Sequence, residues 1–491
     1  MGLLYQETTL SEKAVRGGFW VFAARIFDRL FGIISKVILA RLLAPNDFGL
    51  MGIALLALGI FESFSKTGFQ AALVQKKGRI DEYLDTAWTL QAIRGVVLFA
   101  TLFFAAPFFG AFFKTPLAVN IVRVIGLAFL FENLTNIKVV LFSKELEFNK
   151  QFFYQISGTI ANLVTAIFLA FTTRSVWALA CGFLMGHFVR CIISYSIIAY
   201  RPRFKIDWDK GKELFNFGRW VFTSTILMFF ASQGDDIFVG RIISATALGF
   251  YQMAYYISNT PATELAHVIS TIAFPLYSKL QGEFKRLQRA FLIIVKLTAL
   301  ISFPLAGIIF MLAPDLIQIF LGEKWLPVIT PIQILCIFGL LRANAATGGP
   351  LVLSLGKPKI QTVFSFIHIV ILFSILYPLT VKYGIEGTSM AVVIAFAAIF
   401  IPGTIVNCRL IGVKFLKWLQ HLISSAVGCL IMMGNIYVFK WRVFHGNIHW
   451  MALIGLILVG LLTYLITIIF LERKFIKNLR EILREIKSQR F

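Results

Sequence analysis

Apolar blocks recur along almost the whole 491-residue chain, and each is bounded by charged residues or by proline and glycine. A membrane-spanning helix needs about 20 mostly apolar residues, which is close to the length of these blocks. The pattern therefore predicts about fourteen membrane-spanning helices, since each span with its connection takes up roughly 35 residues. The predicted spans are residues 18–43, 48–64, 86–109, 118–142, 152–171, 176–200, 217–242, 248–273, 290–313, 328–353, 361–383, 387–407, 416–439 and 450–471.

The composition supports this interpretation. Hydrophobic residues make up 58% of the chain and charged residues only 14%, with a mean hydropathy of +0.81. A soluble globular protein of this length carries roughly a quarter of its residues as charged side chains. The sequence thus predicts an all-α membrane protein.

The basic residues are placed as the membrane topology requires. The chain has 47 Lys and Arg against 24 Asp and Glu, a formal net charge of +23. They do not form one patch for nucleic acid but gather in alternate short connections, as at Lys76, Lys77 and Arg79 or at Lys357 and Lys359. Because such loops face the cytoplasm, we expect both termini to be cytoplasmic and membrane lipids, not nucleic acid, to be the partners.

A shift of 200 residues aligns the chain with itself without a gap. It pairs Gly18 with Gly218, Trp20 with Trp220, Phe22 with Phe222, Arg41 with Arg241 and Gly49 with Gly249. Six predicted spans separate the copies, so both have the same orientation, which makes the repeat a parallel one. We expect two six-helix bundles with a cavity between them.

The predicted domains are the bundles 1–200 and 214–410, a basic cytoplasmic linker 201–213, two appended spanning helices in 411–471 and a basic amphipathic cytoplasmic tail 472–491.

Charged residues lie on one stripe of the first predicted span. Arg25, Arg29 and Lys36 share a helix face, with Asp28 beside it. An ion near the bilayer centre costs about 3 kcal/mol, so three cations cannot face lipid without a large penalty. Arg29 falls closest to the midplane. The stripe predicts cations that face a wet cavity, whereas the structural alternative is an Arg25–Asp28 ion pair that only fastens helices together.

Other spans add further candidates. Arg94 and Arg342 are cations inside predicted spans, and we expect them to line the same cavity. Asp236 occupies the position that matches Lys36 in the repeat, with Asp235 next to it. Together with Asp28, these two acids are candidates for ion coupling.

The next span carries a polar stripe of Gln252, Tyr256, Asn259 and Thr263, followed by His267. Aromatic and amide groups suit the faces and hydroxyls of sugars, which makes the first four residues candidate sugar contacts. The same residue types also join helices inside membranes. For His267 a hydrogen-bonded position in the core is favoured over proton transfer.

A cationic cavity selects an anionic substrate. Guanidinium groups bind phosphate oxygens with two parallel hydrogen bonds. A lipid diphosphate fits this chemistry, because its head group can enter a polar cavity while its tail stays in the membrane.

Several motifs resemble a known family. They are ARLLAPNDFGL at residues 40–50, KELEFNK at 144–150, AFP at 273–275, GEKW at 322–325, QILC at 333–336 and GLLR at 339–342. These segments are similar to the polysaccharide transporter family, in particular to the colanic-acid and teichuronic-acid type exporters known as Wzx or O-antigen flippases. The likeness runs from the first span to about Arg342.

The resemblance implies a function. It places the chain in the multidrug/oligosaccharidyl-lipid/polysaccharide exporter superfamily, in the bacterial cytoplasmic (inner) membrane. It implies alternating access between two bundles, undecaprenyl-diphosphate-linked repeat units as cargo, and polysaccharide polymerase and glycosyltransferases as partners. Related lipid flippases use arginines of the first helix, and Arg25 and Arg29 are the matching candidates.

Two other functions were weighed. A cation-coupled multidrug exporter on the same fold would use Asp28, Asp235 or Asp236 as its ion site. A membrane glycosyltransferase or polymerase would need a carboxylate constellation and a large loop, but the predicted loops are short. No catalytic motif, metal-ligand set or phosphate loop stands out in the sequence, so we expect no enzyme activity and no cofactor.

Overall fold

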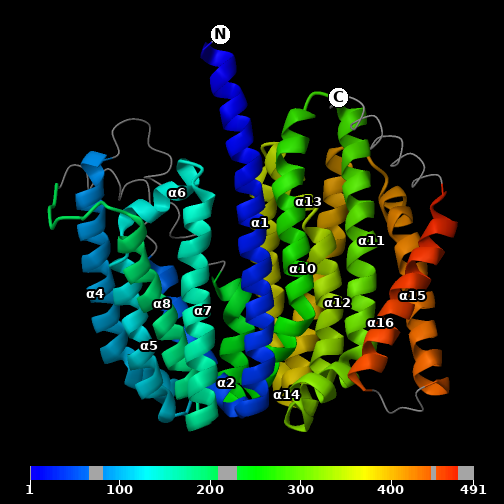
Figure 1. Cartoon of the computed structure of the whole chain (residues 1–491). Helices are drawn as coiled ribbons and strands as arrows, with labels where there is room; N and C mark the ends of the chain where they lie inside the picture. The colour runs from blue at the N-terminus through cyan, green and yellow to red at the C-terminus, as the bar shows by residue number, and fades with distance from the viewer. Residues whose placement is uncertain (1, 66–80, 208–228, 444–448, 474–491) are drawn as a thin grey trace. The chain divides into compact units, whose positions relative to one another are not determined.

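The computed structural model describes residues 2–65, 81–207, 229–443 and 449–473, and within these ranges it is helical without strands (Figure 1). The principal helices are α1 (Gly2–Leu42), α2 (Pro45–Ser65), α4 (Asp81–Phe112), α5 (Leu117–Asn133), α6 (Leu141–Lys144), α7 (Phe148–Thr173), α8 (Trp177–Ile197), α10 (Ala245–Lys279), α11 (Phe284–Leu316), α12 (Ile329–Ala345), α13 (Gly348–Ser354), α14 (Pro358–Leu410), α15 (Phe415–Arg442) and α16 (Trp450–Leu471). Residues 229–242 form a further helix. The all-α fold is confirmed.

The helices follow the predicted spans. Within the described part of the chain, nine helical stretches are long and apolar enough to cross a membrane. They do not include α5, α10, α1, which carries the charged stripe, or residues 229–242, whose predicted span begins outside the described residues. The predicted span 328–353 corresponds to α12 and α13 together.

One helix, α14, contains two predicted spans. Gly384 has φ 60° and ψ −137°, a non-helical conformation that glycine adopts without strain. Thr380 and Thr388 would stand about 12 Å apart along a straight helix, yet their hydroxyl oxygens are 2.9 Å apart. The chain therefore folds back at Gly384, which lies between the predicted spans 361–383 and 387–407.

The fourth span differs from its prediction. It was expected to continue to residue 142, but α5 ends at Asn133 and a short 3-10 helix, Ile137–Val140, follows. Asn136 caps this 3-10 helix, because its side-chain oxygen accepts from Lys138 N at 3.1 Å. Its Nδ2 donates to the carbonyl of Tyr200 at 2.8 Å, beyond the end of α8.

The chain forms two compact units, Met1–Gly249 and Phe250–Phe491. In the first unit α1 and α8 both pack on α7. Their core joins Leu39 of α1, and Leu43 directly after it, to the small residues Ala166 and Ala170 of α7. Small residues let the helix backbones approach closely, which is how membrane helices pack without a hydrophobic driving force between them.

In the second unit two ion pairs tie α11 to the last two helices. Lys440 Nζ of α15 contacts Asp315 Oδ2 of α11 at 2.6 Å. Lys296 of α11 pairs with Glu472, the residue that follows α16, and both side chains are almost buried. A buried charge needs such a partner because desolvation is expensive.

The basic linker is partly anchored. Its first residues run along the start of α4, where the backbone N–H groups of Arg203 and Lys205 donate to Asp85 Oδ1 and Thr89 Oγ1 at 3.0 and 3.1 Å. Tyr200 also donates to Asp85. The rest of the linker (208–213), most of the tail (474–491) and the repeat residues at 218–222 lie outside the described residues, so the predicted domain boundaries stay a prediction.

Candidate functional site

The predicted cationic stripe lies on α1 in the first unit. At about 100° per residue, Arg25, Arg29 and Lys36 fall within about 40° of one another around the helix. Trp20 and Phe27 lie on the opposite side, and both rings contact an aromatic ring of α7 with centroids 5.0 and 5.9 Å apart. Helix α7 therefore packs on the aromatic face of α1 and not on its cationic face. Arg25 is exposed, and the other two cations are half-buried.

Asp28, beside the stripe, belongs to a polar network with α7 and α8. Thr159 Oγ1 donates to Asp28 Oδ1 at 2.9 Å, and Arg190 Nη2 donates to Thr159 Oγ1 at 3.3 Å. The Arg190 side chain lies over Gly158, where a Cβ would come within 2.3 Å of Arg190 Nε. Arg190 was not among the predicted site residues, although the sequence places it as a cation inside the apolar block 176–200.

Arg94 is held between neighbouring helices of the first unit. Its guanidinium donates to Ser65 Oγ at 2.9 Å and to Asn133 Oδ1 at 3.3 Å. Glu62 and Glu132 lie within electrostatic range of the same group. Two nearby acids reduce the positive potential that Arg94 offers to an anion. Its predicted part in diphosphate binding stays a prediction.

The second unit contains Arg342 and the polar stripe of α10. Arg342 on α12 donates to the hydroxyl of Tyr255 on α10 at 3.1 Å. Asn259 is only 1% exposed, and its Oδ1 lies 3.5 Å from the position of a Cβ at Gly339 of α12. Asn259 Nδ2 donates to Ser258 of the same helix, and its Oδ1 accepts no hydrogen bond from the described residues. The sugar contacts and the helix-joining alternative therefore both stay predictions.

The remaining members of that stripe are more accessible. Gln252, Tyr256 and Thr263 are half-buried, and Thr263 Oγ1 donates to the backbone carbonyl of Asn259 at 2.9 Å. His267 is exposed, so the core position expected for it is wrong.

The two acids proposed for ion coupling are buried. Asp235 and Asp236 are 6% and 9% exposed and lie on the helix 229–242, within the first unit. A buried carboxylate loses its hydration, so a bound cation or a proton has to compensate its charge. Their role in coupling stays a prediction.

The two copies of the repeat meet inside the first unit. Helices α2 and α10 begin at Pro45 and Ala245, exactly one repeat apart. Thr246 Oγ1 donates to Asn46 Oδ1 at 3.2 Å, and these residues are also equivalent in the repeat. The repeat thus brings equivalent positions into contact, which a chance alignment does not explain.

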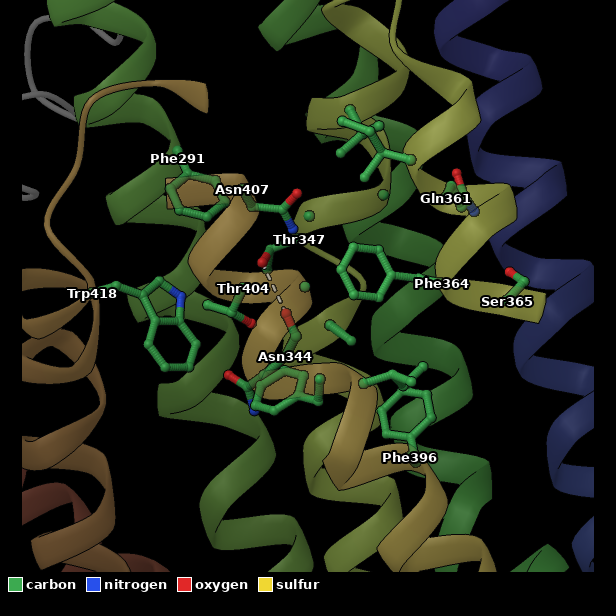
Figure 2. A pocket seen from close by; sticks show the side chains of 18 residues that line it. Phe291, Asn344, Thr347, Gln361, Phe364, Ser365, Phe396, Thr404, Asn407 and Trp418 are labelled. Carbon is green, nitrogen blue, oxygen red and sulfur yellow. Dashed lines mark hydrogen bonds between the residues drawn. The ribbon is translucent and has the colours of Figure 1, made fainter. Parts of the chain in front are cut away.

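A cavity of 220 Å³ in the second unit was not predicted (Figure 2). It lies among helices α11 to α15. Its polar lining residues are Asn344, Thr347, Gln361, Ser365, Thr404 and Asn407, and its aromatic ones are Phe291, Phe364, Phe396, Phe400 and Trp418. The sequence signal was a set of amides and hydroxyls inside apolar spans far apart along the chain. Only the packing of five helices brings them together.

Comparison with known proteins identifies relatives of the chain. A family model described as polysaccharide biosynthesis protein matches residues 38–330. The lipopolysaccharide biosynthesis protein WzxC of Escherichia coli (strain K12) is 24% identical over 364 residues, which make up 73% of this chain and 73% of WzxC. The teichuronic acid biosynthesis protein TuaB of Bacillus subtilis (strain 168) is 24% identical over 71% of this chain and 73% of TuaB.

A solved structure has the same fold. The lipid II flippase MurJ, in an inward closed conformation, aligns with a TM-score of 0.76 and 17% sequence identity, covering 92% of this chain and 99% of MurJ. At this identity the likeness concerns the fold alone. The family match spans more than half of the chain and confirms the resemblance seen in the sequence motifs. The chain is a multi-pass membrane protein that belongs to the family of polysaccharide biosynthesis proteins.

Proposed function

We propose that this protein moves undecaprenyl-diphosphate-linked oligosaccharide units across the bacterial cytoplasmic membrane, by alternating access, for the synthesis of a surface polysaccharide. Membership of the polysaccharide biosynthesis family is the observation that carries the proposal. The names of its relatives WzxC and TuaB point to the same pathway class.

The cations of α1 support a diphosphate as the group that is recognised. Arg25, Arg29 and Lys36 lie on the face of α1 that turns away from α7. Each of them would cost about 3 kcal/mol in contact with hydrocarbon at the bilayer centre. A wet cavity holding a diphosphate removes this cost, because guanidinium groups and phosphate oxygens form charge-assisted hydrogen bonds.

The orientation and partners complete the proposal. The alternation of basic loops supports cytoplasmic termini, so that the cargo enters from the leaflet where glycosyltransferases assemble it. A polymerase on the other side would receive it. Translocation itself breaks no covalent bond, and we propose no enzyme activity for the chain.

The test measures translocation by the purified protein in proteoliposomes. The probe is undecaprenyl diphosphate carrying one N-acetylglucosamine, and the readout is the fraction protected from an impermeant periodate reagent. We expect Arg29→Gln to slow translocation at least about tenfold, since it removes a charge-assisted hydrogen bond, while Arg29→Lys keeps part of the activity.

Arg286→Gln is the matched control. It removes the same charge from an exposed residue in the first turn of α11, where Arg286 pairs with Glu283 at 2.8 Å. We expect translocation at the unmodified rate. Equal rates for Arg29→Gln, Arg286→Gln and the unmodified chain would remove Arg29 from the mechanism.

Cation-coupled export of drugs is the alternative. The burial of Asp235 and Asp236 favours it, because a buried acid suits an exchangeable ion. Efflux of a cationic dye that depends on pH and survives the loss of both Arg25 and Arg29 would support this alternative over lipid translocation.

A further inference from the structure

The cavity of the second unit lies at the helix ends that face the cytoplasm in the predicted topology. Gln361 and Trp418 are each three residues from the starts of α14 and α15, and Asn407 is three residues from the end of α14. The connections next to these ends hold Lys357, Lys359 and several other basic residues, which assign them to the cytoplasmic side. The cavity is thus placed where cargo would first enter the protein.

The lining combines aromatic rings with neutral polar groups. Phe364, Phe396 and Trp418 supply ring faces, while Asn344, Thr404 and the other polar residues supply amides and hydroxyls (Figure 2). None of the described lining residues is charged. Such a lining offers stacking and hydrogen bonds without selecting an ion, which suits an uncharged polyhydroxylated ring.

One buried polar atom of the lining has no hydrogen-bond partner among the described residues. Asn344 is 5% exposed, and its Nδ2 donates to the carbonyl of Leu340 at 2.8 Å and to Ser302 Oγ at 3.3 Å. Its Oδ1 is buried and accepts no hydrogen bond from the described residues. Because buried acceptors are rarely left unsatisfied, a ligand hydroxyl that reaches Asn344 Oδ1 after a small shift of the side chain would supply the missing hydrogen bond.

The size of the cavity limits the ligand. A volume of 220 Å³ is smaller than the roughly 300–1,000 Å³ of pockets for drug-sized molecules. This volume suits one sugar ring, and the rest of a repeat unit would extend beyond the cavity.

We propose that this cavity binds one uncharged sugar ring of the lipid-linked cargo. The inference rests on the proposed function and adds a sugar subsite in the second unit, separate from the cationic stripe of α1 in the first. The described lining contains no cation that could bind a diphosphate. An acyl chain would offer no hydrogen-bonding group to the amides and hydroxyls of the lining.

The test fills the cavity and compares two lipids. Gly403 lines the cavity, and a Cβ at this position would meet only Phe364, at 4.0 Å, so Gly403→Leu occupies the space with little distortion. Gly434→Leu on α15 is the control, since a Cβ there meets nothing within 4 Å. Binding to the full chain in nanodiscs is measured for undecaprenyl diphosphate and for undecaprenyl diphosphate linked to one N-acetylglucosamine.

We expect the unmodified chain to bind the sugar-bearing lipid more tightly than the bare one. Gly403→Leu should weaken binding of the sugar-bearing lipid about tenfold and leave the bare lipid unaffected, whereas Gly434→Leu changes neither. Asn344→Leu, which removes the unpaired acceptor, should have the same selective effect as Gly403→Leu.

Three results would overturn the inference. If filling the cavity changes neither affinity, or weakens both equally, the cavity is no sugar subsite. If the unmodified chain binds both lipids equally tightly, the sugar contributes nothing, although diphosphate recognition and the proposed function stand. If it binds neither lipid, the proposed function itself fails and the subsite fails with it.

Discussion

Alanine at Gly49 or Gly249 should force apart the two helices that cross at the repeat contact. Both glycines are buried, each in the fifth position of its helix. A Cβ at Gly49 would lie 1.7 Å from the backbone oxygen of Ala245, and a Cβ at Gly249 would lie 2.1 Å from that of Pro45. The obstacle is backbone in both cases, so no change of rotamer relieves it.

The magnitude follows from these distances. A carbon normally approaches a carbonyl oxygen to about 3.3 Å, so α2 and α10 must separate locally by roughly 1.6 Å at Gly49 and 1.2 Å at Gly249. Overpacking of this kind costs about 1–3 kcal/mol. Replacing glycine by alanine within a helix returns about 1 kcal/mol. We expect a net loss of up to about 2 kcal/mol for Gly49→Ala and a smaller loss for Gly249→Ala.

The assay is the melting temperature of the purified chain in detergent, followed by tryptophan fluorescence. Gly434→Ala and Gly455→Ala are the matched controls, because they lie in helices and a Cβ at either meets nothing within 4 Å. Their melting temperatures should equal or exceed that of the unmodified chain, whereas those of the two contact variants should fall below it.

The double variant sharpens the test. Once Gly49→Ala has separated the helices, Gly249→Ala meets a contact that is already open, so the double variant should lose less stability than the sum of the single losses. Strictly additive losses, or contact variants as stable as Gly434→Ala, would refute the reasoning that both glycines serve one helix crossing.

Three further predictions follow from pairs of residues. Replacing Lys296 by Met should destabilise the chain by about 3–5 kcal/mol, because it leaves Glu472 buried without its partner. Lys296→Met combined with Glu472→Leu should be nearly neutral. Denaturant unfolding measures the free energy of unfolding of both variants. Asp85→Asn should loosen the start of the basic linker and speed its cleavage in limited proteolysis, with unchanged cleavage counting against the anchoring role. In a cysteine-free background, Asn46→Cys with Thr246→Cys should form a disulfide on oxidation, detected by a gel shift that reducing agent reverses.

Much of the fold was predictable because lipid imposes a strong constraint on sequence. Every backbone polar group in the bilayer needs an internal partner, so apolar blocks of sufficient length have to be helices. The same reasoning located the reversal in α14, since Gly384 stands between two blocks. It failed beyond Asn133, where Asn136 caps a separate 3-10 helix and bonds to the carbonyl of Tyr200, a distant contact that no local pattern reveals.

The candidate site was only partly predictable. Arg25, Arg29 and Lys36 share a face of α1 because helical periodicity alone places them there. Arg190 was not predicted, because it is connected to Asp28 only through Thr159. Thr159 and Asp28 are 131 positions apart in the sequence, so no local pattern reveals this network. Asn259 was assigned to sugar contacts from its residue type, yet its burial against α12 depends on a neighbouring helix.

The amino-acid sequence by itself determined the membrane-spanning helices, their repeat and the cationic face of α1, because these depend on local periodicity and on the cost of placing charge in lipid. The tertiary structure alone decided which helices touch. The neutral cavity around Asn344 and the crossing at Gly49 and Gly249 exist because residues distant in the chain pack within a few ångströms of each other, and packing is a property of pairs of surfaces that no single segment encodes.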